Sequence, residues 1–347
     1  MKKVRIGING FGRIARTIFR INKMSENFEV VAINEINPDN NNIAYLLQYD
    51  STYGRLYDKV TADESYLYVG ENKVKLYHES KINEVPWEDL GVDAVIDASG
   101  IRSNLDLVEQ MPECVKNVFI TNSPSDFEDY NTIIFGVNED KVKWNDKKII
   151  STSICDTIAM TPILNILSQR NKIESGFLTT LHPWLNYQNL LDGPSVSWSL
   201  PGDINSHYAL GRSSVQNIIP KTTSAVSAAN RVFPGLTDKI ESFSYRIPTS
   251  IVSSATLVLL VRDNTSIEDI KNQIKEYEDQ QKFKVVHTTY EPLTAVDFAK
   301  DEHSTIIDLR WLKVEKQKLV HLQYWYDNEW GYSSRVVDAV KHISNQY

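Results

Sequence analysis

Cysteine and histidine side chains are the strongest candidates for chemistry in this sequence, which contains two cysteines and seven histidines. Cys155 follows a short β-rich run and opens the segment CDTIAMTP, where we predict that a helix begins. At a helix N-terminus the dipole stabilises a thiolate, and the backbone N–H groups can receive an oxyanion. Cys155 is therefore a candidate nucleophile.

A nucleophilic thiol needs a base, and His182 is the candidate. It lies near the end of GFLTTLHPW, a predicted strand that a loop follows. A cysteine and a histidine on adjacent elements could form a thiolate–imidazolium pair, although position alone favours a structural histidine. The other cysteine, Cys114, is expected to be an inert packing residue at the edge of a strand. We expect no metal ligands.

A glycine motif near the N-terminus predicts a dinucleotide site. Gly10, Gly12 and Ala15 fit the pattern G-x-G-x-x-G/A between a predicted strand and a predicted helix. Glycines let the backbone approach a pyrophosphate, which the helix N-terminus then stabilises. The next strand ends at Glu35, close to the spacing of about 20 residues expected for the acid that binds a ribose hydroxyl. An acid there repels a 2′-phosphate, so NAD is favoured over NADP.

Strands and helices alternate in the first half of the chain. We predict a helix over 12–24 and β-rich runs at 2–9, 28–34, 93–99, 116–121, 131–137 and 147–152. This alternation is typical of an α/β fold with a doubly wound, parallel Rossmann sheet. We assign residues 1–152 to an NAD-binding domain.

The second half has longer, alternating runs at 173–184, 239–248, 253–263 and 304–326, which are typical of an antiparallel or mixed sheet. Helices are predicted over 155–169 and 266–280, the latter with Ser266 as N-cap. We assign 153–327 to an α+β catalytic domain. A C-terminal helix, about 328–347, is expected to pack with the first domain.

Composition narrows the function classes. The net charge is −8, which argues against a general nucleic-acid binder. No apolar run reaches the ~18 residues that a membrane span needs. The first strand starts within three residues of Met1, which leaves no room for a signal peptide. Two cysteines make no disulfide framework, so we expect a cytoplasmic protein.

Nearly the whole chain resembles the glyceraldehyde-3-phosphate dehydrogenase family. The resemblance is carried by VRIGINGFGRIAR, YLLQYDSTYGRL, FGVN, the cysteine segment, LHPWLNYQ, NIIPKTTSA, RIPTS, DEHSTIIDLR and YWYDNEWGYSSRVVD. It implies a two-domain subunit, NAD, a small-molecule aldehyde substrate, a catalytic cysteine and histidine, and a homotetramer.

The resemblance also implies residue roles in the chemistry. Cys155 matches the nucleophile of the family, and His182 matches the base. Thr223 and Arg246 match residues that hold phosphate groups.

On the cofactor side, Arg13 and Ile14 match the residues whose backbone holds the pyrophosphate. Glu35 stands where the family has aspartate. Asn328 matches the asparagine that binds the nicotinamide carboxamide, and Tyr332 matches the residue that lies against the ring.

The cysteine segment departs from the family, which has Ser-Asn-Ala-Ser-Cys-Thr-Thr-Asn there. In this chain Ile154 replaces the family serine that helps to bind the attacking phosphate, and Asp156 replaces the family threonine after the cysteine. The simplest interpretation of Asp156 is a first-turn acid that favours the helix N-terminus. Alternatively, it binds a cationic or hydroxyl-rich substrate, or it acts as a base for an acceptor water.

Other positions near the expected substrate also differ. Leu185 and Tyr187 replace a threonine and an aspartate, and Ser224 replaces a glycine. The loop 191–214 is longer than in the family, with an added tryptophan and proline, and this leaves the assignment of Arg212 open.

The sequence therefore predicts an NAD-dependent oxidoreductase that oxidises an aldehyde, a sugar phosphate or related polyol aldehyde, through a thiohemiacetal and a thioester on Cys155, or runs the reverse reduction. The altered phosphate sites favour a different substrate or acyl acceptor. The alternatives are an ordinary phosphorylating glyceraldehyde-3-phosphate dehydrogenase, an erythrose-4-phosphate dehydrogenase-like enzyme, and a catalytically weak NAD-binding scaffold.

Overall fold

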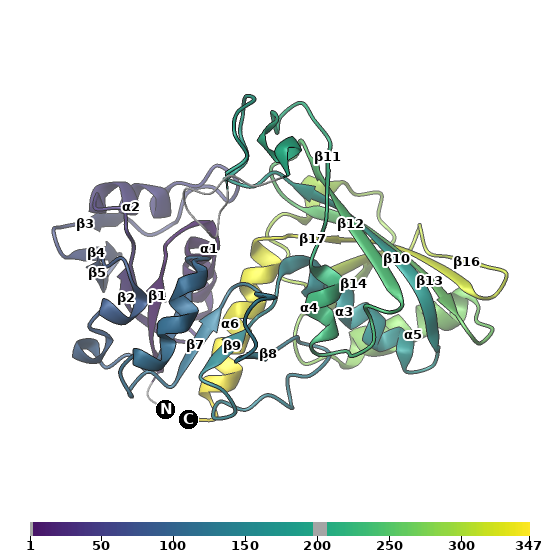
Figure 1. Ribbon diagram of the computed structural model, residues 1–347, viewed down its shortest axis with the longest axis horizontal. Helices are drawn as coiled ribbons and strands as arrows, with labels where there is room; N and C mark the ends of the chain where they lie inside the picture. The colour runs from purple at the N-terminus through teal and green to yellow at the C-terminus, as the bar shows by residue number, and fades with distance from the viewer. Residues whose placement is uncertain (1–2, 197–206) are drawn as a thin grey trace. The chain divides into compact units, whose positions relative to one another are not determined.

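The computed structural model describes residues 3–196 and 207–347. The tryptophan and proline added to the long loop, Trp198 and Pro201, lie outside the described residues. The chain divides into two compact units (Figure 1). The first comprises 1–133, 141–152 and 333–347, and the second comprises 134–140 and 153–332.

The described part of the first unit forms a nine-stranded sheet in the order β3-β4-β5-β2-β1-β6-β7-β9-β8. In this spatial order, each pair of neighbouring strands from β5 through β2 to β8 is parallel. The pairs β3–β4 and β4–β5 are antiparallel. The expected doubly wound Rossmann sheet is thus confirmed. Its strands are β1 Arg5–Asn9, β2 Glu29–Asn34, β3 Val60–Ala62, β4 Tyr66–Val69, β5 Asn72–Tyr77, β6 Ala94–Asp97, β7 Asn117–Ile120, β8 Asn131–Thr132 and β9 Ile149–Ser151.

One expected strand is much shorter than predicted. The run 131–137 keeps only β8, because the chain turns at Ile134, whose carbonyl accepts from the N–H groups of Val137 and Asn138. Ile133, Ile134 and Phe135 of this run are buried all the same, so hydrophobicity alone did not distinguish a strand from a buried turn.

Helices of the first unit follow the expected strand–helix alternation. They are α1 Arg13–Ser25, α2 Asn40–Gln48, and the 3₁₀ helices η1 Ile82–Glu84, η2 Trp87–Leu90 and η3 Arg102–Gln110. The turn from β1 into α1 requires Gly10, which has φ +79° and whose Cβ would lie 2.6 Å from the Cα of Ser99. The first glycine of the motif is therefore required on steric grounds.

The second unit has a mixed sheet, as expected. Its described strands lie in the order β11-β12-β10-β13-β17-β15-β14, with β16 paired to β17. Strand β10 is parallel to β12 and antiparallel to β13. The strands are β10 Ile173–Pro183, β11 Ile219–Lys221, β12 Ile240–Ile247, β13 Ser253–Val261, β14 Val286–Thr289, β15 Thr305–Asp308, β16 Lys313–Glu315 and β17 Leu319–Tyr326.

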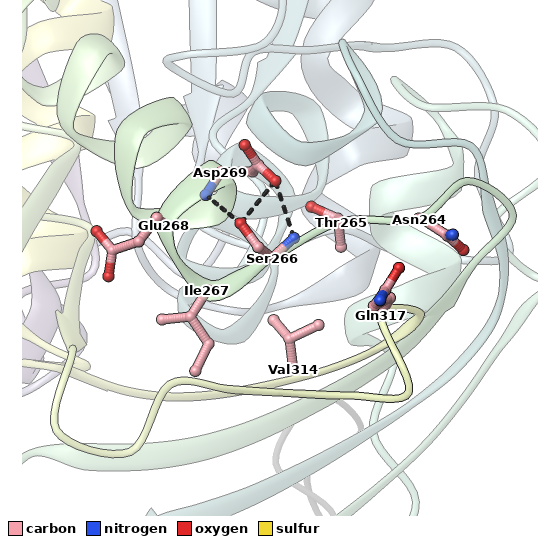
Figure 2. A pocket seen from close by; sticks show the side chains of 8 residues that line it. All are labelled: Asn264, Thr265, Ser266, Ile267, Glu268, Asp269, Val314 and Gln317. Atoms are coloured by element: carbon pink, nitrogen blue, oxygen red, sulfur yellow. Dashed lines mark hydrogen bonds between the residues drawn. The ribbon is translucent and has the colours of Figure 1, made fainter.

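The helical segments that begin in the second unit are α3 Cys155–Ser168, α4 Ala225–Asn230, α5 Ile267–Gln280, α6 Trp330–Ser344, η4 Tyr208–Gly211 and η5 Ala295–Phe298. Ser266 caps α5 as predicted: its hydroxyl accepts from the N–H of Asp269, whose carboxylate accepts from the N–H of Ser266 (Figure 2). The hollow beside this cap is lined by residues 264–269 with Val314 and Gln317. Among the described residues, no helix combines the length and apolar character needed to cross a bilayer.

Candidate active site

The start of α3 presents Cys155. Ser153 has a left-handed backbone, φ +61°, and Ile154 is the N-cap residue, without a side-chain hydrogen bond to the helix. The Tyr332 hydroxyl donates to the Ser153 carbonyl at 3.0 Å. A left-handed non-glycine residue costs about 1–3 kcal/mol and persists only where its surroundings hold it. The bend before Cys155 is therefore anchored by Tyr332.

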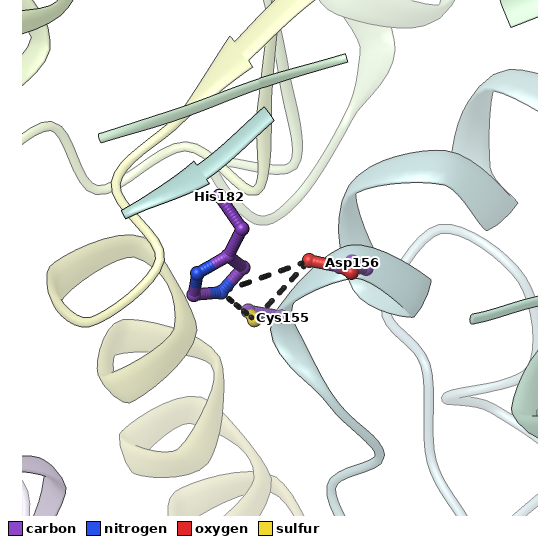
Figure 3. Close-up of side chains that lie close together, drawn as sticks. All are labelled: Cys155, Asp156 and His182. Carbon is purple, nitrogen blue, oxygen red and sulfur yellow. Dashed lines mark hydrogen bonds and ion pairs between the residues drawn. The ribbon is translucent and has the colours of Figure 1, made fainter. Parts of the chain in front are cut away.

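His182 lies on β10, with its ring directed at Cys155 (Figure 3). Its Nδ1 is 2.8 Å from the Pro183 carbonyl, which can only accept, so Nδ1 carries the proton of the neutral ring. The other nitrogen, Nε2, then offers its lone pair to the Cys155 Sγ at 3.6 Å. The tautomer is the one that a base for Cys155 requires.

Asp156 is a third member of this cluster. Its Oδ1 lies 3.5 Å from the Cys155 Sγ and 4.0 Å from the His182 Nε2. The Tyr326 hydroxyl donates to Oδ1 at 2.8 Å, and the Thr223 hydroxyl donates to Oδ2 at 3.2 Å. The carboxylate is buried. Asp156 is thus held within the site, and is more than a first-turn acid on the helix surface.

Burial and charge set the protonation of these groups. Burial, and then Asp156, raise the pKa of the Cys155 thiol well above its usual value. Burial, together with Arg246, lowers the pKa of His182 to about 4, against the attraction of Asp156. Burial would raise the pKa of Asp156, but His182, the Tyr326 hydroxyl and Arg246 hold it below its usual value. These pKa shifts favour a neutral thiol, a neutral ring and a carboxylate over the thiolate–imidazolium pair considered above.

Two cationic side chains lie close enough to act on this cluster. Arg246 is paired with His182 in the register of β10 and β12 and is buried. Its Nε has no hydrogen-bond partner within the described structure. Burial and then Arg246 lower the pKa of Lys221, at the end of β11, while Asp156 raises it. The two cations suit an anionic group on a substrate.

Thr223 is occupied by other groups. Its hydroxyl accepts from the N–H of Ala225, at the start of α4, and donates to Asp156, each at 3.2 Å. Arg212 has an exposed side chain, which pairs with Asp192 at 2.7 Å.

The turn after β10 carries the two substituted positions. Leu185 and Tyr187 are half-buried. The Leu185 N–H donates to the Gln188 side chain at 2.9 Å, which closes the turn.

Two residues of the cluster were missed by the sequence reasoning, Lys221 and Tyr326. Lys221 stands just before the threonines of KTTSA, and Tyr326 stands two positions before Asn328, as the first residue of YDNEWGY. Each lies in a family motif already recognised, so proximity to those motifs was the available signal. The residue expected to pack, Cys114, is exposed, and that prediction was wrong. It lies in the turn before β7, where no strand edge covers it.

Comparison with known proteins identifies the fold family. The NAD-binding domain of glyceraldehyde 3-phosphate dehydrogenase matches residues 4–105, and the C-terminal domain matches 154–328. Glyceraldehyde-3-phosphate dehydrogenase 1 of Kluyveromyces marxianus is 35% identical over 341 residues, 98% of this chain and 100% of the relative. The enzyme of Priestia megaterium is 35% identical over 98% of both chains. The chain belongs to the glyceraldehyde-3-phosphate dehydrogenase family.

Membership makes the chain an NAD-dependent oxidoreductase, and the first unit fits that cofactor. Helix α1 starts after Gly12, which makes no side-chain cap, and a Cβ on Gly12 would meet nothing within 4 Å. The first turn of α1, which includes Arg13 and Ile14, lies at the positive end of the helix dipole, where backbone N–H groups can bind phosphate oxygens. Glu35 accepts from the N–H of Phe11 at 2.7 Å, so its carboxylate braces the glycine turn.

Two further family positions lie in the second unit. Asn328 is buried in the turn between β17 and α6, and its Oδ1 has no hydrogen-bond partner within the described structure. Asp327 fixes this turn by accepting from the N–H groups of Glu329 and Trp330 at 3.0 and 2.8 Å. Asn328 is thus a buried amide with unused capacity, which suits a carboxamide ligand. Tyr332 is buried beside Ser153 through its hydrogen bond.

Proposed function

We propose that this protein oxidises an aldehyde with NAD through a thioester on Cys155, and that the acyl group then passes to an acceptor other than inorganic phosphate. One observation supports this choice above the others. The carboxylate of Asp156 accepts a hydrogen bond from the hydroxyl of Thr223, the residue expected to hold phosphate.

Acylation uses groups that already lie together. The Cys155 sulfur forms a bond to the aldehyde carbon as the C=O π bond opens, and the proton lost from the thiol ends on the carbonyl oxygen, which gives a thiohemiacetal. His182 Nε2, with its lone pair toward the sulfur, then takes the hydroxyl proton. NAD, when bound, supplies the hydride acceptor. Loss of that hydride and proton leaves a thioester, which releases the acid and the free thiol when water attacks its carbonyl carbon.

Phosphate is a poor acceptor at this site on electrostatic grounds. An anion ~4 Å from the Asp156 carboxylate is repelled by roughly 4 kcal/mol at an effective dielectric constant near 20. Ile154 offers no hydroxyl in place of the family serine, and the loss of one hydrogen bond adds about 1 kcal/mol. Water carries no charge and avoids the repulsion, and Asp156 can accept its proton.

The substrate we infer is an anionic aldehyde, a sugar phosphate or a related polyol aldehyde. Arg246 supplies positive charge beside the thiol, and Lys221 supplies it beside His182 and Asp156. We assign substrate binding to Thr223, Arg246 and Asp156. Thr223 acts here through Asp156.

For the cofactor we assign Gly10, Gly12, Arg13 and Ile14 to the pyrophosphate and Glu35 to the ribose. The position of these residues in the glycine turn and at the positive end of the α1 dipole supports the first assignment.

We assign Asn328 to the carboxamide and Tyr332 to the nicotinamide ring. The unused Oδ1 of buried Asn328 supports its assignment.

The test is a panel of aldehydes, phosphorylated and not, with NADH formation followed with and without inorganic phosphate. We expect turnover that phosphate changes less than about twofold. In the Asp156→Thr variant, which restores the family residue, phosphate should accelerate turnover at least tenfold. High phosphate-dependent turnover of glyceraldehyde 3-phosphate by the unaltered protein would favour an ordinary family enzyme. NAD binding without acylation of Cys155 by any aldehyde would favour a scaffold.

We further propose a cytoplasmic homotetramer whose partners are small molecules, and neither nucleic acid nor membranes. Exposed apolar side chains on adjacent strands β10 and β12, Phe177, Leu181 and Phe243, support self-association. Light scattering after gel filtration tests the subunit number. We retain the domain bounds 1–152 and 153–327, with the helix at about 328–347 packed on the first domain.

A further inference from the structure

The three side chains around the reactive thiol also have the composition of a metal site. Three possible ligand atoms lie within 4.8 Å of one another here: the sulfur of Cys155, a carboxylate oxygen of Asp156 and a ring nitrogen of His182 (Figure 3). Sulfur, imidazole nitrogen and carboxylate oxygen are the three ligand types that Zn²⁺ takes in proteins.

The distances suit one tetrahedral ion. With metal–ligand bonds of about 2.0–2.3 Å, tetrahedral angles place the ligand atoms roughly 3.3–3.6 Å apart. The Sγ–Nε2 and Sγ–Oδ1 distances are 3.6 and 3.5 Å. The Nε2–Oδ1 distance is 4.0 Å, so a small side-chain rotation would complete the geometry.

The groups behind these ligands are also arranged as at known metal centres. A metal-binding histidine usually donates its other ring N–H to a carbonyl or carboxylate, and His182 donates Nδ1–H to Pro183 at 2.8 Å. Metal-binding carboxylates are themselves hydrogen-bonded, and Asp156 accepts from Tyr326 and Thr223. The ring, its tautomer and the carboxylate are thus already oriented.

Charge balance also allows a divalent ion. A bound Zn²⁺ would replace the thiol proton, which passes to solvent, and would face one thiolate, one carboxylate and one neutral ring. The two negative charges then cancel those of the ion. The positive charges of Arg246 and Lys221 oppose cation binding. The attraction of the ion to the Asp156 carboxylate must outweigh their repulsion.

We propose that Cys155, Asp156 and His182 bind one Zn²⁺ per subunit and that the ion reversibly blocks the thiol. Half-buried Cys155 leaves the fourth coordination position for water. Binding does not rest on the proposed function, whereas the loss of turnover does. Asp156 is the residue that turns a cysteine–histidine pair into a three-ligand site.

The experiment titrates ZnCl₂ into the chelator-treated full-length protein, with calorimetry for stoichiometry and iodoacetamide labelling for access to Cys155. We expect one ion per subunit, slower labelling of Cys155 in parallel with binding, and recovery on adding EDTA. NADH formation is a separate readout, so the loss of binding and the loss of activity can be told apart.

Variants assign the ligands. Asp156→Asn should weaken Zn²⁺ binding more than about tenfold, and Tyr326→Phe, which removes only a supporting hydrogen bond, by about tenfold. Cys114→Ser and Asp192→Asn remove a thiol and a carboxylate elsewhere on the surface, and both should bind as the unaltered protein does. Far-UV circular dichroism and unfolding curves check that each variant is folded.

The proposal is overturned by any of three results. They are the absence of binding at micromolar Zn²⁺, equal binding by folded Asp156→Asn, and loss of binding in Cys114→Ser. Binding with intact ligand assignments but no aldehyde turnover would retain the metal site and reject the proposed function.

Discussion

The carboxylate of Asp156 should suppress the reactivity of Cys155, and removing it should raise that reactivity. Oδ1 and Sγ are 3.5 Å apart. Two unit charges at that separation repel by about 2–5 kcal/mol for effective dielectric constants of about 40 to 20. A thiol freed from this repulsion has a lower pKa, so a larger fraction of it is thiolate at pH 7. The thiolate is also less nucleophilic, and on a logarithmic scale this loss cancels nearly half of the gain in thiolate fraction. The net prediction for Asp156→Asn is a labelling rate about 10- to 100-fold higher at pH 7.

The assay measures iodoacetamide labelling in a Cys114→Ser background, with EDTA present and mass spectrometry to locate the label. Asp192→Asn, which removes an exposed carboxylate, serves as the matched control and should leave the rate unchanged. An Asp156→Asn variant that is folded and labels no faster than the background protein would refute the electrostatic account of this site.

Three further predictions concern the second unit. The folded His182 ring binds a proton only below about pH 4, whereas an unfolded histidine does so below about 6.5, so the unfolded state binds more protons between these values. The free energy of unfolding, measured by urea titration at each pH, should therefore fall by up to about 3 kcal/mol as pH drops through this window. In His182→Asn this dependence of the free energy of unfolding on pH should be weaker. Thr223→Ala should lower the free energy of unfolding by about 1–3 kcal/mol, since Asp156 loses a hydrogen-bond donor. If turnover of this variant newly depended on phosphate, the assignment of Thr223 as a residue that acts through Asp156 would be contradicted. Ser266→Ala should cost about 1 kcal/mol in thermal unfolding, from loss of the α5 cap, with unchanged kcat/KM.

Local sequence signals accounted for much of the fold. Gly10 and Gly12 mark a turn between a strand and a helix, and Ser266 marks a cap, because each depends on residues nearby in the chain. The run 131–137 shows the limit of this approach. Apolar residues there are buried in a turn, and burial alone does not specify extended backbone.

The surroundings of Cys155 were harder to predict. The thiol and the ring of His182 could be paired from a helix start, a strand end and the family resemblance. The Tyr326 hydroxyl contacts Asp156 across 170 positions of sequence, and that contact depends on how β17 pairs in the sheet. The neutral resting state follows from burial and from Arg246 across the β10–β12 pair, which spacing along the chain does not reveal.

The most direct test of the central claim is the rate at which the acyl group leaves Cys155. A single-turnover experiment would mix the NAD-loaded protein with an aldehyde from the active panel and follow the acyl adduct by rapid quenching and peptide mass spectrometry. The account predicts an adduct on Cys155 that decays at the same rate, within about twofold, with and without inorganic phosphate. An adduct on Cys114, or decay on Cys155 that phosphate accelerates tenfold or more, would contradict it.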